Sequence, residues 1–157
     1  KDCIVALGAG LGCSLAGVTS LTTALDQTHY VGGDLAGRNW VYHNDRGYVT
    51  LDGADLQLST QVQNGNWYDI DNTLPAKLDS GRVFKLWVKH DVSSADNSYA
   101  YAILPYSSAK QVAKWARKPK VKILENTSKC QAVRYGDVVC RIIWHDENTR
   151  PTIEVKE

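Results

Sequence analysis

Aromatic side chains beside amide and basic residues are the feature of this sequence best suited to chemistry. Its 157 residues include five Trp and eight Tyr but a single Phe. Two segments concentrate them, one containing Trp40 and His43 and the other containing Trp67. Flat aromatic faces with hydrogen-bonding neighbours suit stacking on sugar rings. We therefore predict that Trp40, His43 and Trp67 contact a carbohydrate; the alternative is that the tryptophans lie buried inside a sandwich.

The histidines and cysteines do not form a pattern typical of catalysis or metal binding. The four histidines are scattered, and only His90 and His145 precede an aspartate directly. A general base needs a positioned partner in a cleft, so we predict polar histidines at strand ends and assign no catalytic residue. The sequence contains no Cys-x-x-Cys or Cys/His cluster. We expect no metal site and no cofactor.

A strand-like run followed by glycines, Ile4–Gly12, is similar to the phosphate-binding turn of a dinucleotide fold. The spacing argues against that function. After Gly8 and Gly10, the third glycine or alanine would stand at position 13, which is Cys13. The residues that follow are β-branched, unlike a phosphate-binding helix. We predict a glycine-rich turn between two strands.

The four cysteines form two pairs with the same spacing of ten residues, Cys3 with Cys13 and Cys130 with Cys140. Either pair could face across a hairpin at the short separation that a disulfide needs. Buried thiols acting as small apolar groups are the alternative, and the sequence leaves both open.

Composition and charge exclude several classes of protein. The 18 Lys and Arg against 17 Asp and Glu give a net charge of +1, which excludes a strongly basic nucleic-acid binder. No apolar stretch approaches the ~20 residues of a membrane span, so we expect no membrane partner. There is no Met and no signal-peptide pattern at the start. We expect a processed or excised piece of a longer polypeptide; the alternative is an exported protein numbered from its mature end.

Short runs with a period of two dominate the chain, which predicts half-buried strands. In 84–89, for example, Phe84, Leu86 and Val88 fall on one face. Turn-forming segments separate the runs, so the pattern favours an all-β antiparallel sandwich or barrel. The remaining strands are expected at 3–7, 18–25, 40–43, 48–51, 56–62, 99–104, 121–124, 132–135 and 138–144.

One segment, 107–117, breaks this pattern. It begins with serines that can cap a helix, and it places small apolar residues on one helical stripe. Basic residues follow at its end, where the helix dipole favours them, and Pro119 stops it. We predict a short helix and a junction near residue 118.

A succession of motifs, in order along the chain, resembles one known family. The motifs are Ile4–Leu11, Thr22–Thr28, Trp40–Tyr48, Gly65–Asp71, Trp87–His90, Tyr99–Pro105 and Val121–Val133. Together they are similar to polysaccharide lyase family 8, which comprises the hyaluronate, chondroitin and xanthan lyases. Two positions depart from the family pattern: Asp71 stands for the usual Asn, and Asp91 stands for the glycine after the histidine.

The resemblance implies an antiparallel, super-sandwich-like fold of the galactose mutarotase type with one short helix. Residues 1–117 would be part of the central β domain and 118–157 the start of the C-terminal β-sandwich. The parent would be a secreted lyase, extracellular or periplasmic, that cleaves glycans containing uronic acid by β-elimination. In the family the Asn, His, Tyr and Arg that carry out catalysis belong to a helical toroid, and none of those motifs lies here.

We therefore expect this segment to serve as scaffold and as a wall of the glycan cleft. Its partners would be the uronic-acid-containing polysaccharide and the remainder of the parent, including the toroid. The chain alone would be inactive. The alternative is a free-standing carbohydrate-binding β-sandwich module with no enzymatic activity.

Overall fold

The computed structural model describes residues 3–145 and 149–157, and its fold confirms the predicted antiparallel β class with one short α-helix. The elements in chain order are β1 (Ile4–Leu11), β2 (Leu21–His29), β3 (Leu35–Ala36), β4 (Trp40–His43), β5 (Arg46–Thr50), β6 (Leu56–Ser59), β7 (Val62–Asn66), the 3-10 helix η1 (Trp67–Asp69), β8 (Leu78–His90), β9 (Asn97–Pro105), α1 (Ala109–Arg117), β10 (Val121–Asn126), β11 (Cys130–Tyr135), β12 (Val138–Ile143) and β13 (Thr152–Lys156).

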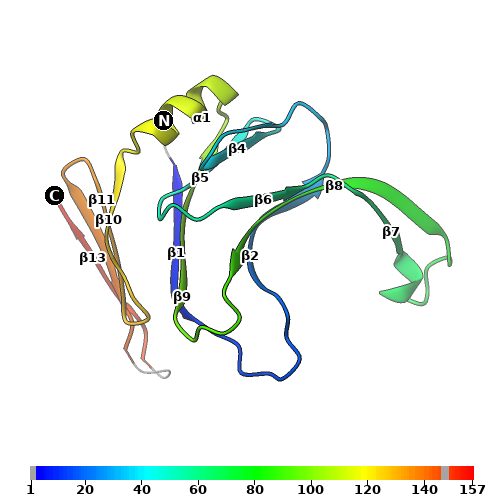
Figure 1. Ribbon diagram of the computed structural model, residues 1–157, viewed down its shortest axis with the longest axis horizontal. Coiled ribbons are helices and arrows are strands. Elements are labelled where there is room, and N and C mark those ends of the chain that lie inside the picture. Colours follow the sequence, from blue (N-terminus) through cyan, green and yellow to red (C-terminus); the bar gives the residue numbers. More distant parts are fainter. Residues whose placement is uncertain (1–2, 146–148) are drawn as a thin grey trace.

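Two antiparallel sheets form the sandwich. The first has the order β1-β9-β5-β4-β3 and the second the order β2-β8-β6, with β7 paired to the beginning of β8 (Figure 1). Alternating residues of both sheets meet in the core between them. The predicted inward face of β8 is confirmed, because Phe84, Leu86 and Val88 are all buried there. They pack with Leu25 of β2 and with Tyr48 of β5.

Helix α1 covers the outer face of the first sheet, which confirms the helix predicted at 107–117. Ser108 and Gln111 form a capping box, in which the Ser108 hydroxyl accepts from the Gln111 amide and the Gln111 side chain accepts from the Ser108 amide. Val112 and Ala116 are buried against Val49 of β5 and other residues of this face. Strand β5 is therefore covered on both sides.

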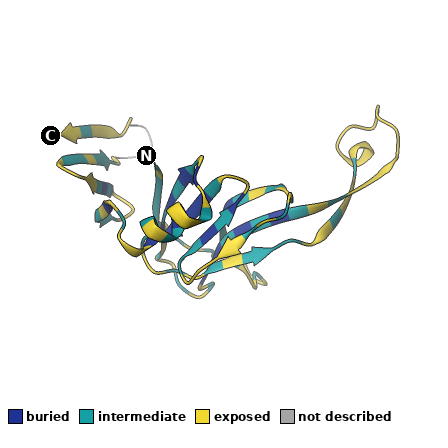
Figure 2. Cartoon of the chain, turned by 90° about the horizontal axis from the view of Figure 1, so that it is seen from above, coloured by how far each residue is buried: buried dark blue, intermediate teal, exposed yellow. Residues whose placement is uncertain are grey.

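Strand β8 is the longest element and continues beyond the sandwich as an arm. Its 13 residues correspond to about 40 Å of extended chain. The first part, Leu78–Arg82, pairs with β7, and η1 lies at the far end of this hairpin. Figures 1 and 2 show the arm projecting from the body, with mostly exposed residues.

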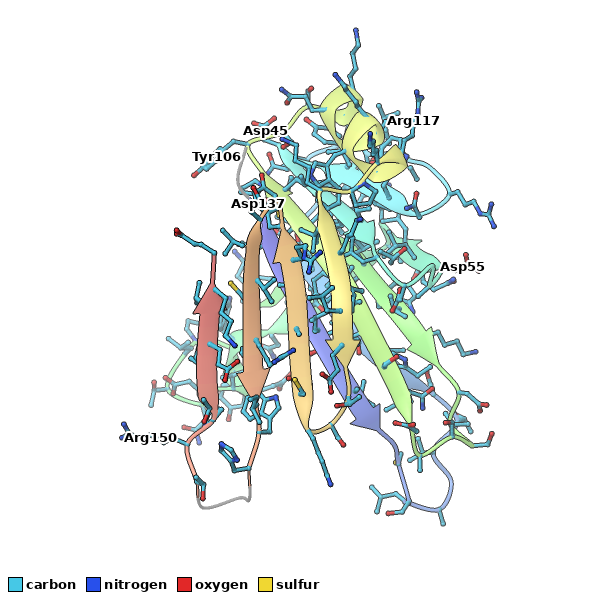
Figure 3. The ribbon with its side chains drawn as sticks, turned by 90° about the vertical axis from the view of Figure 1, so that its left-hand side faces the viewer. Asp45, Asp55, Tyr106, Arg117, Asp137 and Arg150 are labelled. Atoms are coloured by element: carbon cyan, nitrogen blue, oxygen red, sulfur yellow. The ribbon has the colours of Figure 1, made fainter. Side chains whose placement is uncertain are left out.

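A third antiparallel sheet, β10-β11-β12-β13, lies beside β1 and faces the viewer in Figure 3. Its hairpin between β11 and β12 turns at Gly136 and Asp137, between the strands predicted at 132–135 and 138–144. Asn126 of β10 joins this sheet to the sandwich. Its side-chain amide donates to the carbonyl oxygens of Gly8, at 3.2 Å, and Tyr99, at 3.1 Å.

The prediction of a glycine-rich turn at 8–12 is wrong. Gly8 and Gly10 both lie within β1, which pairs with β9 across a register shift between Gly8 and Leu11. The ring of Tyr99 occupies the space that a Cβ on Gly8 would need, and Gly10 has a φ of 71°. The glycines thus allow close packing and a bulge rather than a chain reversal.

Candidate functional site

Trp40 and His43 lie three residues apart, at the two ends of β4, and therefore point to opposite faces of the first sheet. Because side chains alternate along a strand, Val41 and His43 face the core, whereas Trp40 faces the layer under α1. The structure therefore does not bring these two predicted sugar contacts together. Trp67 is a third, separate case, because it stands on the arm (Figure 1).

The prediction that His43 contacts a carbohydrate is wrong, because its side chain has no exposed surface. The imidazole stacks on Phe84, with ring centroids 4.0 Å apart and an interplanar angle of 5°. Its other neighbour is Tyr30, at 5.7 Å and 6°. Neither ring nitrogen of His43 has a hydrogen-bond partner among the described residues. This histidine serves as a flat core residue.

Trp40 is half-buried and belongs to the packing between helix and sheet. It contacts the cluster that contains Val49, Leu104 and Val112. Its indole also occupies the space next to Gly37, where a Cβ would collide with the ring. A role for Trp40 in glycan binding remains a prediction.

Trp67 is the exposed member of the predicted set, with 59% of its surface accessible. It begins η1, which forms because the side chain of Asn66 accepts from the Tyr68 amide at 3.1 Å. The carbonyl of Trp67 then accepts from the amides of Ile70 and Asp71. The indole is held by a local hydrogen-bonded turn and not by a packed core.

A recess of about 390 Å³ lies beside Trp67 on the arm. Paired residues of β7 and β8 line it, since Gly65 is opposite Asp79 and Gln63 is opposite Gly81. Its wall includes the polar side chains of Gln63, Asn64, Asn66, Asp79 and Ser80 together with Trp67 and Ile70. Amide and carboxylate groups bind hydroxyl groups, and an indole supplies an apolar face. This is our candidate carbohydrate-binding site.

Trp67 also borders a second, smaller recess of about 200 Å³. Leu74, Pro75 and Lys77 line it, and Asp79 belongs to both recesses. Trp67 and Asp79 therefore line both recesses at the end of the arm. The sequence predicted Trp67 but none of the other residues that line this second recess.

A buried tyrosine and a half-buried carboxylate form a hydrogen-bonded link between the two sheets of the sandwich. The hydroxyl of Tyr48 donates to Asp26 of β2, and Arg46 lies 3.5 Å from the same carboxylate. Burial and this hydrogen bond raise the pKa of Tyr48 above its ordinary value. A tyrosine that keeps its proton in this way is a poor general base.

The remaining histidines with described contacts bond to hydroxyl groups. His90 Nε2 lies 2.7 Å from Thr23 Oγ1, and His145 Nε2 lies 2.9 Å from Thr152 Oγ1. Within residues 3–145 and 149–157, no group of three or more His, Cys, Asp or Glu side chains is arranged to hold a metal ion. In the same part of the chain, no helix is long and apolar enough to cross a membrane.

The structure forms neither of the two disulfide pairings that the sequence left open. Cys3 and Cys13 flank the extended strand β1, whose eight residues span about 26 Å. In the β11–β12 hairpin Cys130 is opposite Ile143, and Cys140 is opposite Val133. This offset of three residues, about 10 Å, exceeds the separation of about 7 Å that a disulfide tolerates.

Cys13, Cys130 and Cys140 are free thiols. Burial and a hydrogen bond with Glu125 raise the pKa of the Cys130 thiol. A raised pKa keeps this thiol protonated and makes it a weak nucleophile. Cys130 therefore acts as a small core residue of the third sheet.

Comparisons with known proteins identify what the chain is similar to. A family model described as polysaccharide lyase family 8, super-sandwich domain, matches residues 1–116. Chondroitinase-AC of Pedobacter heparinus is 34% identical over 146 residues, which are 83% of this chain and 21% of the relative. The xanthan lyase of Bacillus sp. strain GL1 is 31% identical over 136 residues, which are 81% of this chain and 14% of that enzyme.

Solved structures of similar proteins share this architecture. A chondroitinase AC lyase determined in oligosaccharide complexes has a TM-score of 0.81 and 34% identity, over 90% of this chain and 23% of the other. A Streptomyces coelicolor A3 chondroitin AC lyase in complex with chondroitin sulphate has a TM-score of 0.80 and 27% identity, over 91% of this chain and 20% of the other. The chain spans about a fifth of the length of these proteins.

Proposed function

The chain belongs to polysaccharide lyase family 8, and we propose that it is the β-sandwich segment of a secreted lyase that cleaves uronic-acid-containing polysaccharides by β-elimination. The observation that carries this proposal is the family match over residues 1–116. Relatives named for action on chondroitin, xanthan and hyaluronate support the substrate class. Secretion follows from the substrate, because a long polysaccharide does not cross a membrane unaided.

Within that parent the segment is a scaffold and a wall of the glycan cleft, and proton transfer takes place on the helical toroid. Three tyrosines of this chain, Tyr30, Tyr48 and Tyr101, have pKa values raised above the ordinary value. Proton abstraction from a sugar carbon needs a base that loses its own proton easily. The environments of these three tyrosines favour the protonated phenol, which cannot accept a proton from the sugar.

Because proton transfer is assigned to the toroid, we expect that the isolated chain does not cleave polysaccharide. We expect no rise in the ultraviolet absorbance of unsaturated uronate when the purified chain is incubated with hyaluronan, chondroitin sulfate or xanthan. A full-length protein containing this segment is the positive control, and at least one of the three polymers should be cleaved by it. Sustained turnover by residues 1–157 alone would refute the placement of catalysis on the toroid.

We also propose a boundary between residues 117 and 118, with the start of the C-terminal β domain after it. The family match that ends at residue 116 and the separate sheet that begins at Val121 support this division. Asn126 then tethers the second domain to the first through Gly8 and Tyr99.

The part of the wall that contacts glycan is proposed to be the recess beside Trp67. We expect Trp67→Ala to weaken binding of an oligosaccharide about tenfold, because truncation of an exposed Trp at the centre of a contact typically costs more than 1 kcal/mol. Calorimetric titration of the chain with chondroitin oligosaccharides measures this change.

A matched control for this titration is Trp144→Ala. Trp144 is also exposed, at 46%, but it directly follows β12 of the third sheet, which lies on the side of the molecule opposite the arm (Figure 1). Its replacement should leave the affinity within twofold of that of the unaltered chain. Equal losses from both variants would contradict a specific role for the arm. The alternative function, a free-standing carbohydrate-binding module, shares this site but predicts no cleavage by any longer protein that contains it.

A further inference from the structure

Helix α1 and the segment after it form a basic surface that the proposed function has not used. From Asn97 to Leu124 the chain contains no Asp or Glu. The basic residues in that stretch are Lys110, Lys114, Arg117, Lys118, Lys120 and Lys122. Since the whole chain has a net charge of only +1, this is a local concentration of positive charge.

The fold brings four of these cations to one groove. Val112 and Ala116 face the sheet, so Lys114 and Arg117 are left on the exposed sides of α1. Pro119 then redirects the chain toward β10, and Lys118 and Lys120 flank it. Figure 3 shows Arg117 at the end of the helix, directed away from the sheet.

The groove has a volume of about 840 Å³, larger than either recess on the arm. Its wall includes Lys114, Trp115, Arg117, Lys118, Lys120 and Gln111, and no acidic side chain. The ion pairs in the described part of the chain involve Arg46, Arg141 and Lys156, so none of these four cations is neutralised there. Pockets of this volume are typical of ligand sites.

Trp115 gives the groove a second property besides charge. Its ring is half-buried in the wall, and its indole N–H has no hydrogen-bond partner among the described residues. A buried donor without an acceptor is uncommon in folded proteins. A partly exposed aromatic ring beside four cations matches a ligand with both a ring and negatively charged oxygen atoms.

We propose that this groove binds carboxylate- or sulfate-bearing segments of the polysaccharide, at a second site distinct from the recess beside Trp67. The identity of the polymer rests on the proposed function, whereas the charge and shape of the groove do not. Lys and Arg donate to carboxylate and sulfate oxygens, and Trp115 lies against the sugar ring. Because α1 lies on the body of the molecule and the arm projects away from it, one long polysaccharide chain could bind at both sites and gain affinity through linkage (Figure 1).

The test is a triple variant, Lys114→Gln with Arg117→Gln and Lys118→Gln, titrated calorimetrically with chondroitin sulfate oligosaccharides and with neutral dextran oligosaccharides. All three side chains are exposed, so the fold should be retained, which circular dichroism checks. We expect the unaltered chain to prefer the sulfated ligand. The triple variant should lose about tenfold in affinity for it, with no change toward dextran. Added salt should weaken the binding of chondroitin sulfate to the unaltered chain, and it should have much less effect on its binding to the triple variant.

A charge-matched control removes three exposed cations elsewhere, through Lys89→Gln, Lys129→Gln and Arg134→Gln. This variant should bind chondroitin sulfate as the unaltered chain does. If the first triple variant binds as tightly as the unaltered chain, or both variants lose affinity equally, the groove is not the site and the proposal is overturned. If the groove instead binds an acidic surface of another protein, the first triple variant should bind chondroitin sulfate as tightly as the unaltered chain does. Trp67→Ala reports on the arm separately, so failure of one site is distinguishable from failure of the other.

Discussion

Replacing Phe84 by alanine should destabilise the fold by about 3–5 kcal/mol, the largest loss that we expect from any single truncation in the chain. Phe84 has no exposed surface and lies between the sheets. Its ring stacks on His43 at 4.0 Å and lies 6.3 Å from the ring of Tyr48. Alanine would leave a cavity bounded by two flat rings, which cannot collapse easily to fill it.

Urea denaturation followed by tryptophan fluorescence measures this loss as a shift of the unfolding midpoint. A loss of this size is a large fraction of the 5–15 kcal/mol that typically stabilises a domain, so the variant is expected to be partly unfolded at 37 °C. Phe84→Leu should lower the free energy of unfolding by less than Phe84→Ala does. Val62 is 57% exposed on the arm, so Val62→Ala should change the free energy of unfolding by less than about 0.5 kcal/mol. A loss below 1 kcal/mol for Phe84→Ala would show that the stacked rings are not the centre of the core.

The prediction of β8 from sequence succeeds at Phe84 because a half-buried strand imposes a period of two on its residues. The same reasoning correctly places the hairpin at Gly136 and the helix that ends before Pro119. Each of these features depends on neighbours within about ten residues, and local patterns are what a single sequence displays.

Predictions that depended on distant neighbours failed. His43 has the residue type of a sugar ligand, but its environment is created by Phe84 and Tyr30, which other elements supply. The glycines of β1 are typical of a turn, yet Gly8 is small because Tyr99 of β9 packs over it. In both cases the residue type is explained by a contact far away in the chain.

The candidate site was predicted in part. Trp67 and its flanking amides form one sequence segment, so composition alone identifies them. Asp79 reaches the same recess only because β7 and β8 pair with Gly65 opposite it, and the sequence carries no signal for that register. The basic groove does have a signal in the sequence, which is the absence of acidic residues from Asn97 to Leu124. Basic residues at the end of a helix are also explained by the helix dipole, so this signal alone does not predict a groove.

Gly47 should tolerate no side chain, and Gly47→Val is expected to destabilise the fold by about 3 kcal/mol, at the upper end of what overpacking costs. The residue lies in β5 directly under α1 and is buried. A Cβ there would stand 2.9 Å from Cγ1 of Val112 and closer still to Cγ2. Val112 is β-branched and fully buried, so it cannot rotate away, and the helix itself would have to move.

Gly47→Ala should show a smaller loss of about 1–3 kcal/mol, and Gly81→Ala is the matched control. Gly81 is also a strand glycine, but a Cβ at that position meets no atom within 4 Å, so its replacement should be nearly neutral. Thermal unfolding compares the three variants, with about 2–4 °C expected per kcal/mol for a domain of this size. Because displacement of α1 also displaces Lys114 and Arg117, Gly47→Ala should weaken chondroitin sulfate binding at the groove while leaving the arm unaffected. Equal stability of Gly47→Ala and Gly81→Ala would show that α1 does not pack on β5 as described.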